Sequence, residues 1–278
     1  MSQSRERTQA LQPPAVDGHA LATGTGVEEA LGMGRGENRV VRRRSSWTLL
    51  VVLSAVVVLG VALTIAVWWA LSSQERRASY AVRGQLDGIA LDLGNADAEI
   101  VGGRDEAVIA VRRTDRFAFG RPPVSRRAVS DRVLRLRSRC ASGILVACSA
   151  TYRLTVPNNV PITVRTGSGD VQLGGFRGSA RIQTQTGDIS ASSFCGFLLQ
   201  ARADRGDVSA TAACAPERLE LRSRTGDIQA VVPPGRYRID ADSDEGSRTL
   251  AGLLPAEDAP FQILALSGAG DVRVEAGP

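Results

Sequence analysis

The stretch TGSGDVQL, residues 166–173, decides the fold because its Gly-Asp step recurs along the second half of the chain. The later copies are TQTGDISA, ADRGDVSA, SRTGDIQA and SGAGDVRV. The corner pairs are Gly169-Asp170, Gly187-Asp188, Gly206-Asp207, Gly226-Asp227 and Gly270-Asp271. Their aspartates lie 18, 19, 20 and 44 residues apart, and the last interval divides at Gly246-Ser247, which occupies the Gly-Asp position. One such step would carry no information, but five at this spacing indicate an internal repeat.

Other positions keep the same register relative to the corner aspartate. Eight and six residues before it the side chains are apolar in every unit, and four residues before it they are small. These three columns are Ile162, Ala180, Leu199, Leu219, Ile239 and Ile263; Val164, Ile182, Ala201, Leu221, Ala241 and Ala265; and Thr166, Thr184, Ala203, Ser223, Ser243 and Ser267. One residue after the aspartate, five of six side chains are β-branched, with Arg248 as the exception. This period of two predicts short strands with one inward face, broken by the corner.

Units of this length cannot bury an apolar face alone, so they are expected to stack on one another. The sequence therefore predicts an all-β fold, a β-solenoid in which neighbouring coils are separated by the strand spacing of about 4.8 Å. An earlier echo places Ile89, Leu91 and Leu93 before Asp97 at the same offsets. We expect the solenoid to span residues 86–278.

Residues 47–71 form a run without a charged side chain and predict one transmembrane α-helix. A helix of that length spans roughly 37 Å, enough to cross a hydrocarbon core of about 30 Å. Trp47, Trp68 and Trp69 stand at its ends, where indoles favour the interface. A cleaved signal peptide is the alternative, but its apolar region is typically about 7 to 15 residues.

Arginine placement predicts the orientation of this helix. The N-terminal flank is rich in arginine, whereas the other flank places Glu75 beside Arg76 and Arg77. The positive-inside rule then places the N-terminus in the cytoplasm and the C-terminal domain outside the cell membrane. Residues 1–46, poor in large apolar groups, are expected to be a disordered cytoplasmic tail, and residues 72–85 a juxtamembrane linker.

All four cysteines follow the apolar segment, in the part where disulfides persist if the orientation holds. Cys195 and Cys214 each lie seven residues after a corner aspartate, so they occupy one column of successive coils. Their Cα atoms should then be about 4.8 Å apart, within the range that a disulfide needs. Cys140 and Cys148 are left to pair with each other. Four free thiols are the alternative.

The Gly-Asp corners have a structural and a metal-binding interpretation. Glycine supplies a positive φ or room for close approach, and the aspartate carboxylate caps backbone N–H groups in the turn. Alternatively, stacked carboxylates repel one another and could be countered by calcium. Neighbouring arginines could neutralise the column instead, namely Arg181, Arg202, Arg205, Arg222 and Arg224. The nine-residue period of calcium-binding repeats is absent, so no metal ligand or cofactor is assigned.

Residues 104–153 differ from the repeats in charge. They hold twelve arginines against four acids, whereas residues 154–278 hold twelve against fifteen. The segments AVIAVRR, VLRLRSRC and CSATYRLTVP alternate like strands, and GRPPVSRRAVSD, residues 120–131, reads as a loop. The arginines could face an anionic membrane or wall polymer, or they could form a solvated strand face.

Composition disfavours most enzyme classes. The only histidine is His19, and there is no lysine, so histidine-dependent catalysis and most zinc sites are disfavoured. The one carboxylate cluster that could cleave glycosides is Asp240, Asp242, Asp244 and Glu245. Alternation places the three aspartates on one strand face, which is more often the solvent face. We therefore assign no catalytic residue, and the expected outside location argues against nucleic acid.

The segments LTVPNNVPITVRTGSGDVQLGGFRGSARIQTQTGDISAS and VPPGRYRIDADSDEG, together with the anchor, resemble the bacterial membrane-anchored putative-adhesin family. That family consists of domains of unknown function with Gly-Asp β-helical repeats, and the resemblance covers roughly residues 86–278. It implies a non-enzymatic surface binding or scaffold module of the cell envelope, with the bilayer and an envelope polymer or membrane protein as partners. The alternatives are an envelope-stress or signalling accessory and a carbohydrate-active β-helix enzyme.

Overall fold

The computed structural model describes residues 45–72, 74–103, 108–118, 122–140 and 148–277. The tail expected over residues 1–46 lies outside this part, apart from its last two residues. Helix α1 (Ser45–Ser72) contains a stretch, Trp47–Trp69, that is long and apolar enough to cross a membrane. Two polar side chains within this stretch are satisfied by the helix itself, because the hydroxyls of Ser54 and Thr64 donate to carbonyl oxygens three residues earlier at 3.0 and 2.8 Å.

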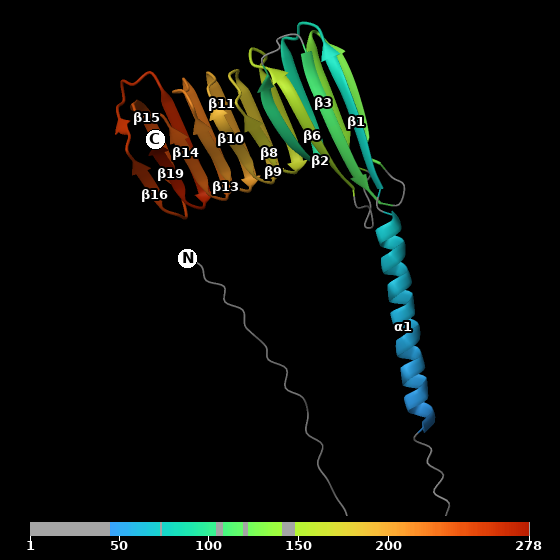
Figure 1. Ribbon diagram of the computed structural model, residues 1–278. Helices are drawn as coiled ribbons and strands as arrows, with labels where there is room; N and C mark the ends of the chain where they lie inside the picture. Colours follow the sequence, from blue (N-terminus) through green and yellow to red (C-terminus); the bar gives the residue numbers. More distant parts are fainter. Residues whose placement is uncertain (1–44, 73, 104–107, 119–121, 141–147, 278) are drawn as a thin grey trace, which may run out of the picture. The chain divides into compact units, whose positions relative to one another are not determined.

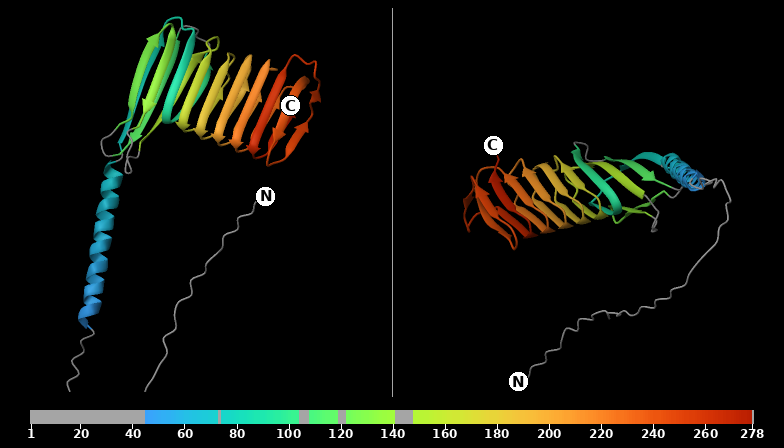
Figure 2. Two further views of the ribbon diagram at one scale, coloured as in Figure 1. Left: turned by 180° about the vertical axis from the view of Figure 1, so that it is seen from behind. Right: turned by 90° about the horizontal axis from the view of Figure 1, so that it is seen from below.

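The second part of the structure is a solenoid built from two sheets that face each other (Figures 1 and 2). Each regular coil gives one strand to each sheet, and the Gly-Asp corner joins the two strands. Sheet B contains, in spatial order, β4 (Val124–Ser130), β5 (Val133–Arg139), the first half of β2 (Gly88–Gly103), β7 (Ile162–Ser168), β9 (Ala180–Thr186), β11 (Leu198–Arg205), β13 (Arg218–Thr225), β18 (Gln262–Ala269) and β15 (Arg236–Ser243). Sheet A contains β1 (Gln74–Arg83), β3 (Val108–Phe117), β6 (Cys148–Pro157), the second half of β2, β8 (Val171–Gly174), β10 (Ile189–Phe194), β12 (Val208–Ala212), β14 (Ile228–Val232), β19 (Val272–Ala276) and β16 (Arg248–Ala251). A short strand, β17 (Leu254–Pro255), pairs with the start of β15.

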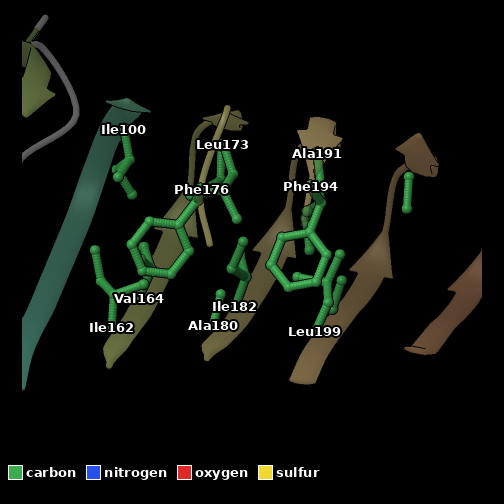
Figure 3. Close-up of a cluster of buried hydrophobic side chains, with 14 of the residues drawn as sticks. Ile100, Ile162, Val164, Leu173, Phe176, Ala180, Ile182, Ala191, Phe194 and Leu199 are labelled. Carbon is green, nitrogen blue, oxygen red and sulfur yellow. The ribbon is translucent and has the colours of Figure 1, made fainter. Parts of the chain in front are cut away.

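The core lies between the two sheets and confirms the predicted apolar columns. The columns eight and six residues before each corner are buried, except that Ile239 in the end coil is half-buried. Two phenylalanines, Phe176 and Phe194, lie six residues after their corner aspartates and fill the space between the sheets (Figure 3). Burial of a side chain of this size contributes about 1.5–3 kcal/mol. Stacking of identical columns therefore holds the coils together, and the predicted β-solenoid is confirmed.

The coils do not stack in sequence order at either end of the solenoid. Strand β2 lies between the coil of β5 and β6 and the coil of β7 and β8. At the other end, β18 and β19 lie between the β13–β14 coil and the β15–β16 coil. The Gly246-Ser247 unit therefore forms the end coil, although in sequence it lies between the units of Asp227 and Asp271. Both units carry the same inward columns, so the pattern alone does not distinguish their places.

Antiparallel strands extend the solenoid at the β5–β6 end, and two of them differ from expectation. Residues 74–83 form β1, which pairs with β3, although residues 72–85 were expected to be a linker. Only Tyr80 and Val82 of β1 are partly buried, too few to give an alternating apolar pattern. Residues 124–130, expected in a loop, form β4, in which Arg127 takes the position opposite inward Leu136 and lies 4.5 Å from the ring centre of Tyr80, so the apolar alternation of a strand is missing. Asp131 and Arg132 both have positive φ, 53° and 57°, as a two-residue hairpin turn requires.

Candidate binding faces of the solenoid

The Gly-Asp corners require glycine for both of the expected reasons. Gly206, for example, has a φ of 136°, a region that residues with a side chain rarely adopt. A Cβ added there would also lie under 3.0 Å from the carbonyl oxygen of Gly187 in the preceding coil. The N–H of Gly206 donates in the opposite direction, to the carbonyl oxygen of Thr225 at 2.9 Å. The corner is thus a site of close backbone approach between successive coils.

The corner aspartates cap backbone N–H groups, but each cap reaches into the next coil instead of its own turn. Asp188 Oδ1 accepts the N–H of Asp207 at 2.8 Å, and Asp207 Oδ1 accepts that of Asp227 at the same distance. The same bond runs from Asp97 through the corner column to Ser247, with distances of 2.8 to 3.1 Å. We name this series the aspartate ladder: Asp97, Asp170, Asp188, Asp207, Asp227 and Asp271. At the corner the chain leaves one parallel sheet and enters the other, so the N–H that follows each corner glycine has no carbonyl partner in either sheet. The aspartate of the neighbouring coil supplies that partner.

The last member of the aspartate ladder is bound most fully. Both the backbone N–H and the hydroxyl of Ser247 donate to Asp271 Oδ1, at 2.8 and 2.9 Å. The backbone hydrogen bond, with the hydroxyl second, holds the pKa of Asp271 below its usual value because both bonds favour the carboxylate. The spatial order of the coils, not the order in sequence, brings these two residues together.

The expected ways of neutralising the ladder are not seen among the described residues. Within this part of the chain, no group of three or more His, Cys, Asp or Glu residues is arranged to hold a metal ion. The arginines proposed as counter-charges point to other partners. Arg224 pairs with Asp204 at 3.2 Å, Arg181 donates to Gln200 at 2.9 Å, and Arg205 donates to Thr186 at 3.2 Å. Instead, the carboxylates of the aspartate ladder are exposed to solvent and accept hydrogen bonds from backbone N–H groups of the next coil.

A second ladder, which sequence analysis described only as a small-residue column, runs beside the first inside the core. The buried hydroxyls of Thr166, Thr184, Ser223 and Ser267, with the half-buried hydroxyl of Ser243, each donate to a corner carbonyl oxygen of the neighbouring coil. Ser223 reaches Gly206 O at 2.8 Å, for example. The signal was present, because these positions hold serine or threonine between otherwise apolar columns. A buried hydroxyl needs such a partner.

All four cysteines are bridged in the predicted pairing. Cys195 and Cys214 join successive coils with a Cα–Cα distance of 4.8 Å. Cys140 and Cys148 are joined with a Cα–Cα distance of 5.8 Å, and the loop between them lies outside the described residues. The first bridge therefore ties neighbouring coils, and the second ties the ends of β5 and β6.

The carboxylate cluster lies on the end coil. Asp240 and Asp242 are exposed on the outer face of β15, opposite Leu264 and Leu266 of β18, and Asp244 and Glu245 follow the strand. This is the solvent face that alternation predicted. The carboxylates form an acidic rim at this end of the outer face of sheet B.

Sequence analysis missed a buried ion pair beneath the antiparallel strands. Arg113 Nε donates to Asp115 Oδ1 at 2.5 Å, a second contact joins the same two side chains, and Arg113 also donates to Pro123 O at 3.0 Å. Asp115 is 3% exposed. The Arg113 guanidinium also lies 5.8 Å from the ring centre of buried Tyr152. The sequence did contain a signal for this ion pair, because Arg113 and Asp115 take the two inward-facing positions of β3 between Val111 and Phe117.

The outer face of sheet B carries a row of arginines that we name the arginine face: Arg165, Arg181, Arg202 and Arg222. These side chains are exposed and come from four successive strands, β7, β9, β11 and β13. Shallow cavities lie between them. One of about 220 Å³ is lined by Arg181, Arg202 and Arg222, and one of about 390 Å³ by Arg165 and Arg202. Strands β4 and β5, which belong to the basic segment expected over residues 104–153, lie beyond this face at one end of sheet B.

Comparison with known proteins shows that the repeats are similar to a known family. Residues 158–274 match the family described as Toastrack DUF4097. A comparison with curated protein sequences finds no match to this chain.

Among solved structures, one neighbour is described as a "putative cell adhesion protein" from Clostridium sporogenes, at 11% identity and TM-score 0.47, covering 73% of this chain and 100% of that one. Another is a "putative adhesin" from Bacteroides fragilis, at 14% identity and TM-score 0.35, covering 73% and 97%. A third, from Parabacteroides distasonis, is described as a "putative lipid binding protein", at 11% identity and TM-score 0.27, with the same coverage. The family resemblance expected from the Gly-Asp units is thus confirmed by the sequence match, since residues 158–274 are similar to the Toastrack DUF4097 family.

Proposed function

We propose that this protein is a single-pass membrane protein whose solenoid acts outside the cytoplasm as a non-enzymatic binding or scaffold module of the bacterial cell envelope. The observation that carries the proposal is the set of rigid outer faces. Stacked coils fix their outward side chains in columns one strand spacing apart, which suits recognition of an extended partner. The Toastrack match supports a binding module of this kind.

The apolar helix and the disulfides support the placement. Helix α1 is long and apolar enough to anchor the chain, and an uncleaved anchor accounts for its length better than a signal peptide does. Two disulfides are typical of an oxidising compartment. The arginines before the helix favour a cytoplasmic N-terminus.

Orientation is tested with single cysteines introduced at Ser4 and at exposed Ser192, because the native cysteines are bridged. A membrane-impermeant thiol reagent should label the Ser192→Cys variant in intact cells and the Ser4→Cys variant only after lysis. The reverse pattern would show that the orientation is inverted. Loss of the N-terminal segment from the mature chain would show that the helix is a signal peptide.

Function is tested by immobilising the full chain in detergent and presenting purified envelope polymers and purified membrane proteins separately. Saturable binding to a polymer supports a surface binding module. Binding only to a membrane protein would favour a signalling accessory instead. Turnover of a glycan by the purified chain would contradict the non-enzymatic assignment.

A further inference from the structure

Within the described residues, no arginine of the arginine face is paired with a carboxylate: Arg165 and Arg181 donate to glutamines, and Arg202 and Arg222 have no side-chain hydrogen bond at all. Arg202 and Arg222 stand directly opposite each other on β11 and β13, both exposed. Among the described residues, neither has a carboxylate oxygen within 4.0 Å. The nearest acids on these strands are already engaged: Glu220 pairs with Arg218 at 3.4 Å and accepts from Gln200 at 2.9 Å, and Asp204 pairs with Arg224.

The placement of Arg202 opposite Arg222 costs free energy when no anion is bound between them. Like charges directly opposite on neighbouring strands repel each other, and a parallel register holds the two side chains about 4.8 Å apart at their bases. Gln183, on the other side of Arg202, is engaged by Arg165 Nε at 3.4 Å and supplies no negative charge. An anion between Arg202 and Arg222 would relieve the repulsion.

The geometry favours a phosphate over a carboxylate. One arginine fork already satisfies a planar carboxylate through its two oxygens. A carboxylate holds its acceptor sites in one plane, whereas the oxygens of a tetrahedral phosphate do not confine the two arginines that line the cavity to a single plane. The 220 Å³ cavity is large enough for one such group, and it is lined by three arginines, Arg181, Arg202 and Arg222, against one carboxylate, Glu220, which already pairs with Arg218.

The length of the face favours a polymer over a single ion. Arg165 lies in the same column as Arg202, two strands away, which corresponds to roughly 9 to 10 Å. The 390 Å³ cavity joins the two residues. The column is bounded at one end by Leu266 and Asp242. At the other end, Asp92 is paired with Arg137 and Arg139 at 3.5 and 3.3 Å.

We propose that the arginine face binds a linear polymer bearing phosphate groups, with one phosphate held between Arg202 and Arg222 and another contacted by Arg165. This inference rests on the proposed binding function and names its ligand class and site. The acidic rim of Asp240 and Asp242 excludes the polymer from the end coil, which sets the direction in which it lies.

The test uses the full chain in zwitterionic nanodiscs and measures its affinity for long-chain inorganic polyphosphate. The variant is Arg202→Gln with Arg222→Gln. The matched control is Arg177→Gln with Arg273→Gln, which removes the same charge from exposed positions away from the face. Polyglutamate, inorganic phosphate and phosphatidylglycerol vesicles are the comparison ligands, and thermal unfolding verifies that both variants are folded.

We expect the face variant to weaken polyphosphate binding at least tenfold, the control to change it less than twofold, and polyglutamate to bind more weakly than polyphosphate. Equal losses in the two variants would overturn the site, because they would show a general charge effect. Equal binding of polyglutamate would overturn the choice of phosphate, and binding of vesicles without polyphosphate would overturn the choice of polymer. If envelope partners bind the parent and the face variant alike, the site is wrong while the proposed function stands.

Discussion

Replacing Gly206 by alanine tests the close approach of successive coils at the corner. The φ of 136° alone costs a residue with a side chain about 1–3 kcal/mol. The added Cβ would also lie under 3.0 Å from backbone atoms of Gly187, and backbone held in two sheets cannot rotate away as a side chain can. Overpacking of this kind typically costs a further 1–3 kcal/mol or so. We therefore expect Gly206→Ala to destabilise the solenoid by about 4 kcal/mol.

Gly175→Ala is the matched control, because Gly175 also has a positive φ, 58°, but a Cβ there would meet nothing within 4 Å. Only the backbone cost of about 1–2 kcal/mol should appear. Urea unfolding of the full chain in detergent, followed by the β-sheet circular dichroism signal, measures both changes. If the two variants lose the same stability, steric contact between coils is not what the corner glycine avoids, and the argument is wrong.

Three further predictions concern the ladder and the bridges. Asp188→Asn should lower the free energy of unfolding by under about 1 kcal/mol, because the amide oxygen still accepts the N–H of Asp207 in the next coil, whereas Asp188→Ala should lower it by about 1–2 kcal/mol. Urea unfolding measures both changes. A loss of stability that calcium chelation reproduces in the parent protein would contradict this. Replacing Cys195 and Cys214 together by serine should lower the free energy of unfolding by about 3 kcal/mol for a loop of this length. Unchanged stability of this variant, or a different crosslink in non-reducing peptide mapping of the parent, would show that the pairing is wrong. Folding lowers the pKa of Asp271, so this carboxylate stabilises the fold at pH values above its unfolded pKa, and that stabilisation is lost as the pH falls through the folded pKa. Ser247→Ala should raise the pKa of Asp271 in an NMR titration, and no change would refute the role of the hydroxyl.

The repeat itself could be predicted from the sequence because each coil repeats the same physical requirements. The corner needs glycine, the inward columns need apolar side chains, and the buried position near the corner needs a small one. Those constraints set the register closely enough that spacing alone pairs Cys195 with Cys214. Local periodicity therefore determined the coil, its core and the Cys195–Cys214 bridge.

The order of the coils and the arginine face depend on information that periodicity does not contain. The β13–β14 coil would accept either the β15–β16 coil or the β18–β19 coil as its neighbour, because both have apolar inward columns. In the end coil, Arg248 replaces the β-branched residue after the corner, a feature that fits an exposed last position. Sequence analysis treated Arg202 and Arg222 as counter-charges for the corners. The neighbours of an outward side chain lie on the adjacent strands of the sheet, and which strands are adjacent depends on the stacking order of the coils.

Out-of-order stacking has a consequence for how the protein matures. If the chain crosses the membrane from its N-terminal side, residues 236–251 emerge before residues 262–276, yet the later segment occupies the slot against β13 and β14. The edges of these two strands must therefore stay open, or be released again, until the later segment arrives. During that interval they offer unpaired N–H and C=O groups to any extended polypeptide nearby. The end coil can therefore take its final place only after β18 and β19 have paired with β13 and β14, and a folding helper that shields a strand edge would act before this step.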